Sequence, residues 1–304
     1  MTNGIRSRVL VTGGAGFIGR RVVRALLAAG HDVTSADRHA FRHDRVRSVV
    51  GDLCEPATVA AAVTPGLDAI IHLAAVTSVV LSVDDPVGTY RLNVEATANL
   101  LERARQLGVS AFLLASTNAV TGNVGRQTIT ERVPLRPLTP YGATKAAGEM
   151  LLSAYTASYA LRGAALRFSN VYGPGMEAKD SFIPRLMRAA RDGTGVQVRG
   201  DGTMLRDVVQ VDDVVAGILL AWHTEHTGPL ILGSGQSVTV NDMVDAARAV
   251  TGAPIPVEYV PVGPGEMPAV VLDISAARAL GYQPAYDLKA GIATVWPDFS
   301  EAAR

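Results

Sequence analysis

Short aliphatic and β-branched runs alternate with longer segments of helical periodicity over roughly the first 170 residues. The short runs are apolar on both faces, as in strands buried inside a parallel sheet, and the longer segments predict helices that cover it. The expected strands are Arg8–Val11, Asp32–Ala36, Arg47–Val50, Ala69–Leu73, Ala111–Ala115 and Ala164–Phe168. The expected helices are Gly16–Ala29, Val87–Leu107 and Tyr141–Ala160. This alternation predicts an α/β chain with a Rossmann-type, doubly wound parallel sheet.

The pattern loosens after about residue 170. Glycine and proline become frequent in stretches such as VYGPG, TGPLILGSG and PVGPGEMP, and the helical segments become short. We therefore expect residues 1–170 to form a nucleotide-binding Rossmann domain, to which some later segments return. Residues 171–304 are expected to form mainly a smaller α/β lobe that binds substrate over the carboxyl ends of the strands, where open α/β sheets bind ligands.

Composition narrows the class of protein. The 304 residues are 48% hydrophobic and 18% charged, which is typical of a globular chain with a large core. Lys plus Arg and Asp plus Glu number 28 each, so no basic surplus favours nucleic acid. No apolar run is long enough for a membrane span, and no signal-peptide pattern is present. The single cysteine, Cys54, is interpreted as a small buried side chain. A cytoplasmic protein without a metal site is expected.

A glycine-rich motif, TGGAGFIG at Thr12–Gly19, joins the first strand to the first helix. Gly13 or Gly14 lets the chain turn tightly, Gly16 lets a pyrophosphate approach the backbone, and Gly19 lets the helix pack on the strand. The helix N-terminus then offers free N–H donors and a favourable dipole to the phosphates. The motif predicts a dinucleotide site.

The second and third strands end in carboxylates that refine this site. Asp37 lies 24 residues after Gly13, where a carboxylate accepts hydrogen bonds from the adenosine ribose and repels a 2′-phosphate. Asp52, in GDL, is expected near the adenine. Arg38 and Arg42 instead favour NADP, because a guanidinium can bind its 2′-phosphate. We expect NAD rather than NADP.

The segment PYGATK carries candidate chemistry. Tyr141 and Lys145 are four residues apart on an expected helix and therefore share a face. The pKa of a free tyrosine is about 10, but a nearby ammonium and a positive nicotinamide ring both favour the phenolate, so we expect a lowered pKa for Tyr141. Lys145 is also placed to hold the nicotinamide ribose. The strand FLLAST ends in Ser116 and Thr117, which supply a hydroxyl beside the phenol. The group predicts proton transfer coupled to redox chemistry.

These motifs, with HLAA, NVEATANLLE, STNAVTG, LRFSNVYGPG, GDGTMLRDVVQVDDVV and LGYQP, resemble the extended short-chain dehydrogenase/reductase family, in its nucleotide-sugar epimerase/dehydratase branch of the UDP-glucose 4-epimerase type. The resemblance covers nearly the whole chain. It implies that Thr117 bonds the reacting sugar oxygen, Tyr141 is the acid/base and Lys145 binds the ribose. It implies diphosphate contacts from Asn170 and Arg206. The NAD contacts that it implies are Gly13, Gly16, Phe17, Ile18, Gly19, Asp37, Arg38, Asp52, Leu53, Leu73, Ala74, Ala75, Asn93, Tyr141 and Lys145.

Departures from the family pattern narrow the reaction. Dehydratases of this branch follow the active-site Thr with an Asp-Glu pair, whereas this chain has Asn118 and Ala119, which cannot act as general acid and base. Thr121 stands where the family usually has the tyrosine of VYG. A second phosphate-binding arginine is expected before PGE, but this chain has Gly263 there, so Arg206 is left as the evident diphosphate clamp. Arg185 or Arg199 could supply the missing second arginine contact to the diphosphate.

The resulting expectation is an NAD-dependent epimerase of a nucleotide-activated sugar, UDP- or another NDP-sugar, acting at C4 through a keto intermediate. The alternatives are a ketoreductase or dehydrogenase of a sugar or another small alcohol and, in a different class, a non-catalytic NAD sensor. The long helices after strands four and five resemble the family's four-helix homodimer contact. His72 is interpreted as a core residue, and Asp212 and Asp213 as caps of the following helix.

Overall fold

The computed structural model describes residues 6–262 and 267–300, and its contacts divide the chain into two compact units. The first unit is built from Met1–Gly122, Val133–Arg167 and Val215–Leu230. The second is built from Asn123–Arg132, Phe168–Val214 and Ile231–Arg304. Each unit is therefore discontinuous in sequence.

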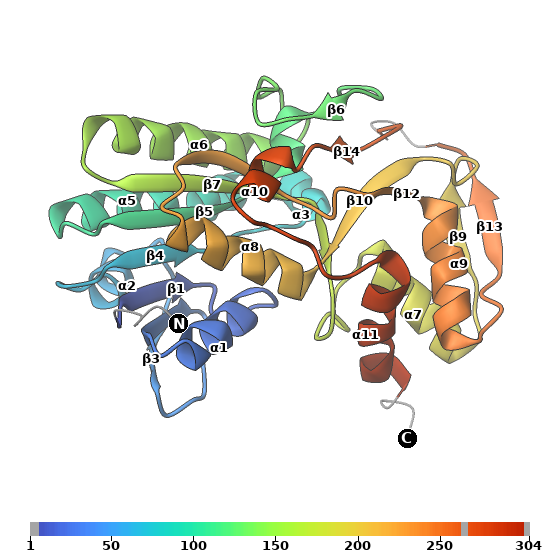
Figure 1. Cartoon of the computed structure of the whole chain (residues 1–304), viewed down its shortest axis with the longest axis horizontal. Helices are drawn as coiled ribbons and strands as arrows, with labels where there is room; N and C mark the ends of the chain where they lie inside the picture. Colours follow the sequence, from blue (N-terminus) through green and yellow to red (C-terminus); the bar gives the residue numbers. More distant parts are fainter. Residues whose placement is uncertain (1–5, 263–266, 301–304) are drawn as a thin grey trace. The chain divides into compact units, whose positions relative to one another are not determined.

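A seven-stranded sheet lies at the centre of the first unit, in the order β11-β7-β5-β4-β1-β2-β3 (Figure 1). Its strands are β1 Arg8–Thr12, β2 Asp32–Asp37, β3 Val46–Val50, β4 Ala69–His72, β5 Ala111–Thr117, β7 Arg162–Phe168 and β11 Gly228–Leu232. β1 pairs in parallel with both β2 and β4, so Val9 lies between Val33 and Ala69. The order reverses direction at β1, which is the feature of a doubly wound sheet. The predicted fold class is confirmed, and all six predicted strands are present.

Helices cover both faces of the sheet. One face packs against α2 Pro56–Ala62, α5 Ala96–Gln106 and α6 Pro140–Ser158, whose apolar residues form one buried cluster with the strands. The other face carries α1 Gly19–Ala28 and the later part of α8 Val211–His223 (Figure 1). The cluster includes Leu10, Ile70, Phe112 and Leu114 from successive strands, so the apolar runs read from the sequence are the core.

Two predicted helices differ from the structure. The one expected at Gly16–Ala29 begins at Gly19, because the preceding residues form a turn in which the Gly16 amide donates to the Gly13 carbonyl oxygen at 3.0 Å. The one expected at Val87–Leu107 is divided into α4 Pro86–Tyr90, a π-helical turn and α5. The π turn, η1 Arg91–Glu95, widens the helix by one residue per turn and buries Asn93.

The second unit contains three small sheets: β12-β10-β8, β13-β9 and β14-β6. Their strands are β6 Thr128–Ile129, β8 Asn170–Tyr172, β9 Val196–Arg199, β10 Leu205–Gln210, β12 Ser237–Thr239, β13 Val257–Val260 and β14 Val271–Leu272. Three helices, α7 Phe182–Asp192, α9 Val240–Thr251 and α11 Leu288–Ser300, pack on one another. Two further short helices are α3 Val79–Asp84 and α10 Ser275–Ala279.

The predicted capping role of Asp213 is wrong. Its carboxylate accepts the backbone amides of Ala285 at 2.8 Å and Tyr286 at 3.4 Å, far along the chain. Asp212 and Asp213 do lie in the first turn of α8. Asp213 therefore anchors the segment before α11 instead of capping its own helix. Within residues 6–262 and 267–300, no helix is long and apolar enough to cross a membrane.

Candidate active site

The glycine turn after β1 has room for no side chain at its two critical positions. Gly13 has a φ of +67°, and a Cβ there would lie 2.8 Å from the Ala74 amide nitrogen. A Cβ on Gly19 would fall on the Gly13 carbonyl oxygen. Gly16 is exposed, and α1 has neither a capping side chain nor an acidic residue in its first turn. The turn thus leaves a helix N-terminus without a carboxylate in its first turn, which fits a pyrophosphate.

At the end of β2, Asp37 is bonded to the turn itself. One carboxylate oxygen accepts the Ala15 amide at 3.1 Å, and the other accepts the His39 amide at 3.0 Å. The Arg38 guanidinium bonds the Asp52 carboxylate at 2.9 Å, with 60% and 38% of the two side chains exposed. Asp37 therefore stands at the turn, while the charge of Arg38 is paired with Asp52. This arrangement favours the ribose-binding role of Asp37 over a 2′-phosphate site at Arg38.

Cys54 follows Asp52 and packs against the apolar cluster under the sheet. Burial, followed by the nearby Asp52 carboxylate, raises the pKa of its thiol to about 11. The thiol is therefore protonated near neutral pH and is a poor nucleophile. Cys54 is only partly buried, so the predicted buried side chain packs at the margin of the cluster and not inside it.

A chain of buried hydrogen bonds crosses the end of β4 through His72. The Ala74 amide donates to the Thr12 hydroxyl at 3.3 Å, and the Thr97 hydroxyl donates to the Asn93 carbonyl oxygen at 2.7 Å. The Thr12 hydroxyl lies 2.6 Å from His72 Nδ1, and Thr97 lies 2.9 Å from Nε2. Because Thr97 donates its proton to Asn93, it can only accept a hydrogen bond from the imidazole, and we therefore assign the imidazole proton to Nε2. Burial lowers the pKa of His72 to about 3, so the ring is neutral. The structural role expected for His72 is confirmed.

Asn93 joins the segment after β4 to α6, the helix that carries Tyr141 and Lys145. Its carboxamide oxygen accepts the Val76 amide at 2.8 Å, and its nitrogen donates to the Val76 carbonyl and to the Thr144 hydroxyl, both at 3.0 Å. Thr144 in turn donates to the Tyr141 carbonyl oxygen at 2.8 Å. Asn93 thus holds Val76, which directly follows the predicted cofactor residues Leu73, Ala74 and Ala75, beside α6. The other predicted cofactor positions are in the glycine turn, Phe17 and Ile18, and after β3, the buried Leu53.

The N-terminus of α6 is held at three points. Pro140 occupies the first helical position, and the Thr139 hydroxyl accepts the Gly142 amide at 3.2 Å. The Ser82 hydroxyl accepts the Tyr141 amide at 3.1 Å and donates to the Val79 carbonyl oxygen at 2.7 Å. The turn that carries Tyr141 is therefore fixed from α3 as well as from its own cap.

Tyr141 and Thr117 meet as predicted, but the pKa of the phenol differs from the expectation. Their hydroxyls share a hydrogen bond, which lowers the pKa of Tyr141, while burial of the phenol raises it more strongly. The prediction of a lowered pKa is wrong for the protein alone, because desolvation outweighs the hydrogen bond and Lys145 makes no resolved contribution. Tyr141 is a protonated phenol at neutral pH.

Lys145 is buried one turn further along α6. Its ammonium donates to the Ala115 carbonyl oxygen at 2.9 Å, and only 4% of the residue is exposed. Burial lowers its pKa to about 8, and the charge of Glu149 opposes that shift. The structure therefore brings Thr117, Tyr141 and Lys145 to one edge of the sheet, as the sequence predicted.

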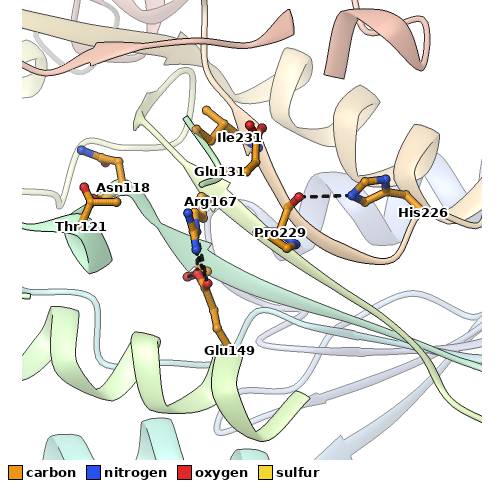
Figure 2. A network of polar contacts seen from close by, with 9 residues as sticks. Asn118, Thr121, Glu131, Glu149, Arg167, His226, Pro229 and Ile231 are labelled. Carbon is orange, nitrogen blue, oxygen red and sulfur yellow. Dashed lines mark hydrogen bonds and ion pairs between the residues drawn. The ribbon is translucent and has the colours of Figure 1, made fainter. Parts of the chain in front are cut away.

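Two residues beside this group, Glu149 and Arg167, were not predicted from the sequence. Glu149 accepts a short hydrogen bond from the Ser116 hydroxyl and pairs with Arg167 of β7 at 2.8 Å (Figure 2). The ion pair is buried, with 4% and 7% of the side chains exposed. The available signals were a glutamate four residues after Lys145 and an arginine inside an otherwise apolar strand.

The predicted diphosphate contacts belong to the second unit. Asn170 is the first residue of β8, and its side-chain amide nitrogen donates to the Asp207 carbonyl oxygen at 3.2 Å. The guanidinium of Arg206 donates to the Met267 carbonyl oxygen at 2.9 Å. Gly263 lies outside the described residues.

The substitutes suggested for the second arginine are also in this unit. Arg185 is paired with Asp180 at 2.6 Å, and Arg199 ends β9. Among the residues that the structure describes, no cluster of three or more His, Cys, Asp or Glu side chains could hold a metal ion.

Known proteins resemble the chain along nearly its whole length. Residues 9–232 match the profile of the NAD dependent epimerase/dehydratase family. A dTDP-glucose 4,6-dehydratase of Streptomyces griseus is 35% identical, over 94% of this chain and 92% of the relative. A UDP-glucose 4-epimerase of Mycolicibacterium smegmatis is 34% identical, over 94% and 96%. The structure of Thermus thermophilus UDP-glucose 4-epimerase in complex with NAD superposes with a TM-score of 0.88 at 34% identity, covering 96% of this chain and 98% of that one.

Proposed function

Because the chain belongs to the NAD dependent epimerase/dehydratase family, we propose that it is a 4-epimerase of a nucleotide-activated hexose or uronic acid. The cofactor is NAD, as predicted. Its relatives include both UDP-glucose 4-epimerases and dTDP-glucose 4,6-dehydratases, so the enzyme class is a nucleotide-sugar epimerase or dehydratase. The proposal concerns which of the two reactions this chain performs.

The described residues fit the cofactor. The glycine turn would hold the pyrophosphate, Asp37 the adenosine ribose and Lys145 the nicotinamide ribose. When bound, NAD supplies the hydride acceptor that is needed to make a keto sugar and the donor that reduces it again.

The chain's own residues supply the proton chemistry. Tyr141 takes the proton of the reacting sugar hydroxyl and returns it after the sugar has turned over. The Thr117 hydroxyl, which faces the phenol in the protein alone, turns its single proton to the same sugar oxygen when the substrate is bound. Since burial raises the pKa of Tyr141, the phenolate needs a cation to stabilise it, and Lys145 lies one helical turn away. The group therefore becomes a base only when a positive charge faces it.

The observation that carries the proposal is the pair of residues after Thr117. Asn118 and Ala119 present an amide and a methyl group where loss of water requires an acid and a base. The Thr121 hydroxyl donates to the Asn118 carbonyl oxygen at 2.8 Å, which fixes the turn that carries both residues. Oxidation and reduction at C4 need neither carboxylate, so epimerisation is retained while dehydration is disfavoured.

A ketoreductase or dehydrogenase is the second candidate. Glycine at position 263 removes the expected second arginine, and a weaker diphosphate anchor would let the keto sugar leave before it turned over. The same Thr117, Tyr141 and Lys145 would serve that reaction, with exchange of the cofactor in each cycle. The intact Tyr141 and Lys145 argue against a non-catalytic sensor.

The test follows the hydride. The purified protein is passed through gel filtration and incubated with UDP-glucose, UDP-glucuronic acid or dTDP-glucose deuterated at C4, without added cofactor. We expect retained NAD and a C4-inverted product that keeps its deuterium, measured by NMR. A 4-keto-6-deoxy product would establish dehydration instead. Stoichiometric release of NADH, or a need for added NADPH or NADH with a ketone substrate, would establish the reductase.

A further inference from the structure

The end of β5 is joined to α6 by three successive contacts. Three consecutive strand residues each bond one of three helix residues that are spaced four apart and so share one face. The contacts join Ala115 to Lys145, Ser116 to Glu149 and Thr117 to Tyr141. The third helix residue, Glu149, has no part in the proton chemistry described above. Its burial next to that chemistry requires a separate explanation.

Glu149 is held from two sides. The Arg167 side chain donates to both of its oxygens, from Nε at 3.0 and 3.1 Å and from Nη2 at 2.8 Å. Figure 2 shows this pair between α6 and β7. On the other side, the Ser116 hydroxyl donates to Oε1. Because Ser116 is committed to Glu149, Thr117 is the hydroxyl at this strand end that remains for the substrate.

Glu149 carries the negative charge that acts on Lys145, while its own ion pair is with Arg167. The titratable neighbours of Lys145 on the packed elements are His72 of β4, which is neutral, Tyr141, a phenol, and the Glu149–Arg167 pair. Burial works against the ammonium, and Glu149 is the charge that opposes this effect. The negative charge of Glu149, one helical turn away, therefore limits how far burial lowers the pKa of Lys145.

We propose that Glu149 is a positioning residue that, fixed by Arg167 and Ser116, keeps Lys145 charged and holds the end of β5 in register with the catalytic helix. The role in turnover rests on the proposed function, whereas the effect on Lys145 does not. Arg167 acts one step further away, because its guanidinium bonds both oxygens of the Glu149 carboxylate and holds them in place.

The charge of Lys145 can be measured directly, because the chain has only three lysines: Lys145, Lys179 and Lys289. The protein is labelled with ε-13C-lysine, and NMR follows the three signals between pH 6 and 11. The Lys145 signal is assigned with Lys145→Arg. The test variant is the double substitution Glu149→Gln and Arg167→Met, which removes both charges together and so leaves no buried ion unpaired.

The matched control is the double substitution Glu102→Gln and Arg105→Met, the same chemical change in a surface ion pair of α5 whose side chains are 39% and 38% exposed. In the test variant we expect Lys145 to titrate lower by on the order of one pH unit. In the control we expect the wild-type titration. The titrations of Lys179 and Lys289 should match the wild type in both variants.

An unchanged Lys145 titration in the folded test variant would overturn the proposal and leave Glu149 with a merely structural role. The pH dependence of kcat is then measured with UDP-glucose, and the alkaline decline should shift to lower pH with the Lys145 signal. If the wild-type protein does not turn over any nucleotide sugar, the proposed function fails while the NMR result still decides the role of Glu149. If the test variant fails to fold, Ser116→Ala is used, for which we expect a smaller downward shift of Lys145; no shift in it also overturns the proposal.

Discussion

The adenosine end and the catalytic end of the predicted NAD site each contain an ion pair, and the two pairs differ in their exposure to solvent. At the adenosine end, Arg38 and Asp52 pair with 60% and 38% of their side chains exposed. At the catalytic end, Arg167 and Glu149 pair with 4% and 7% exposed, next to a buried Lys145. Solvent screens the first pair and not the second. We therefore expect loss of the first pair to change cofactor selectivity only slightly, and loss of the second pair to lower both stability and turnover.

The largest expected effect is on stability. Glu149→Gln leaves the Arg167 guanidinium buried without its counter-ion, and breaking such a pair typically costs about 3 to 5 kcal/mol. We expect a clear drop in the thermal unfolding midpoint, measured by circular dichroism. Asp52→Asn, which breaks the exposed pair, should leave the midpoint nearly unchanged. Equal drops in the two variants would remove the distinction between the two ends of the site.

The next effect is on turnover. Tyr141→Phe removes the proton acceptor and keeps the ring, so turnover should fall by on the order of 100-fold or more while NAD binding persists. Tyr155→Phe makes the same change on the same helix, at a hydroxyl that bonds Glu102, and should have little effect. Product formation by NMR and NAD binding by calorimetry measure the two quantities. Near-normal turnover in Tyr141→Phe would reject the mechanism.

A smaller effect concerns the choice of cofactor. Because Asp37 stands at the turn and Arg38 is paired elsewhere, NAD should bind at least about tenfold more tightly than NADP, or about 1.4 kcal/mol. Asp37→Asn removes the charge that repels a 2′-phosphate and should narrow this difference. Calorimetry with both cofactors measures it. Equal affinities in the wild-type protein would mean that Arg38 outweighs Asp37.

The smallest effect tests Asp52 itself. Asp52→Asn releases Arg38, which can then turn toward a 2′-phosphate, so NADP affinity should rise by less than about fivefold. The gain should disappear at high salt, because both partners are largely exposed. A rise in NADP affinity that persists at high salt would show that these charges are screened by solvent less than their exposure indicates. Glu102→Gln, which breaks an exposed ion pair on α5 instead, is the control.

Several features followed from local sequence alone. Strands β1 to β5 and β7 follow from apolar runs, and the glycine turn follows from residues that leave no space for a Cβ. The shared face of Tyr141 and Lys145 follows from a spacing of four on a helix. These features depend on periodicity and backbone sterics, which neighbouring residues carry by themselves. The catalytic roles of Thr117, Tyr141 and Lys145 remain predictions.

Other features were decided only when distant segments packed together. Glu149 and Arg167 are 18 residues apart on a helix and a strand, and no spacing rule joins them. The direction of the Tyr141 pKa shift depends on desolvation, which exists only once the sheet and helices enclose the phenol. The π turn at Asn93 forms where its carboxamide can reach Val76 and Thr144. The sequence by itself thus determined the fold and the candidate reactive groups, because local periodicity and sterics specify them. Only the tertiary structure decided their protonation and their partners, because burial and long-range contacts arise from packing.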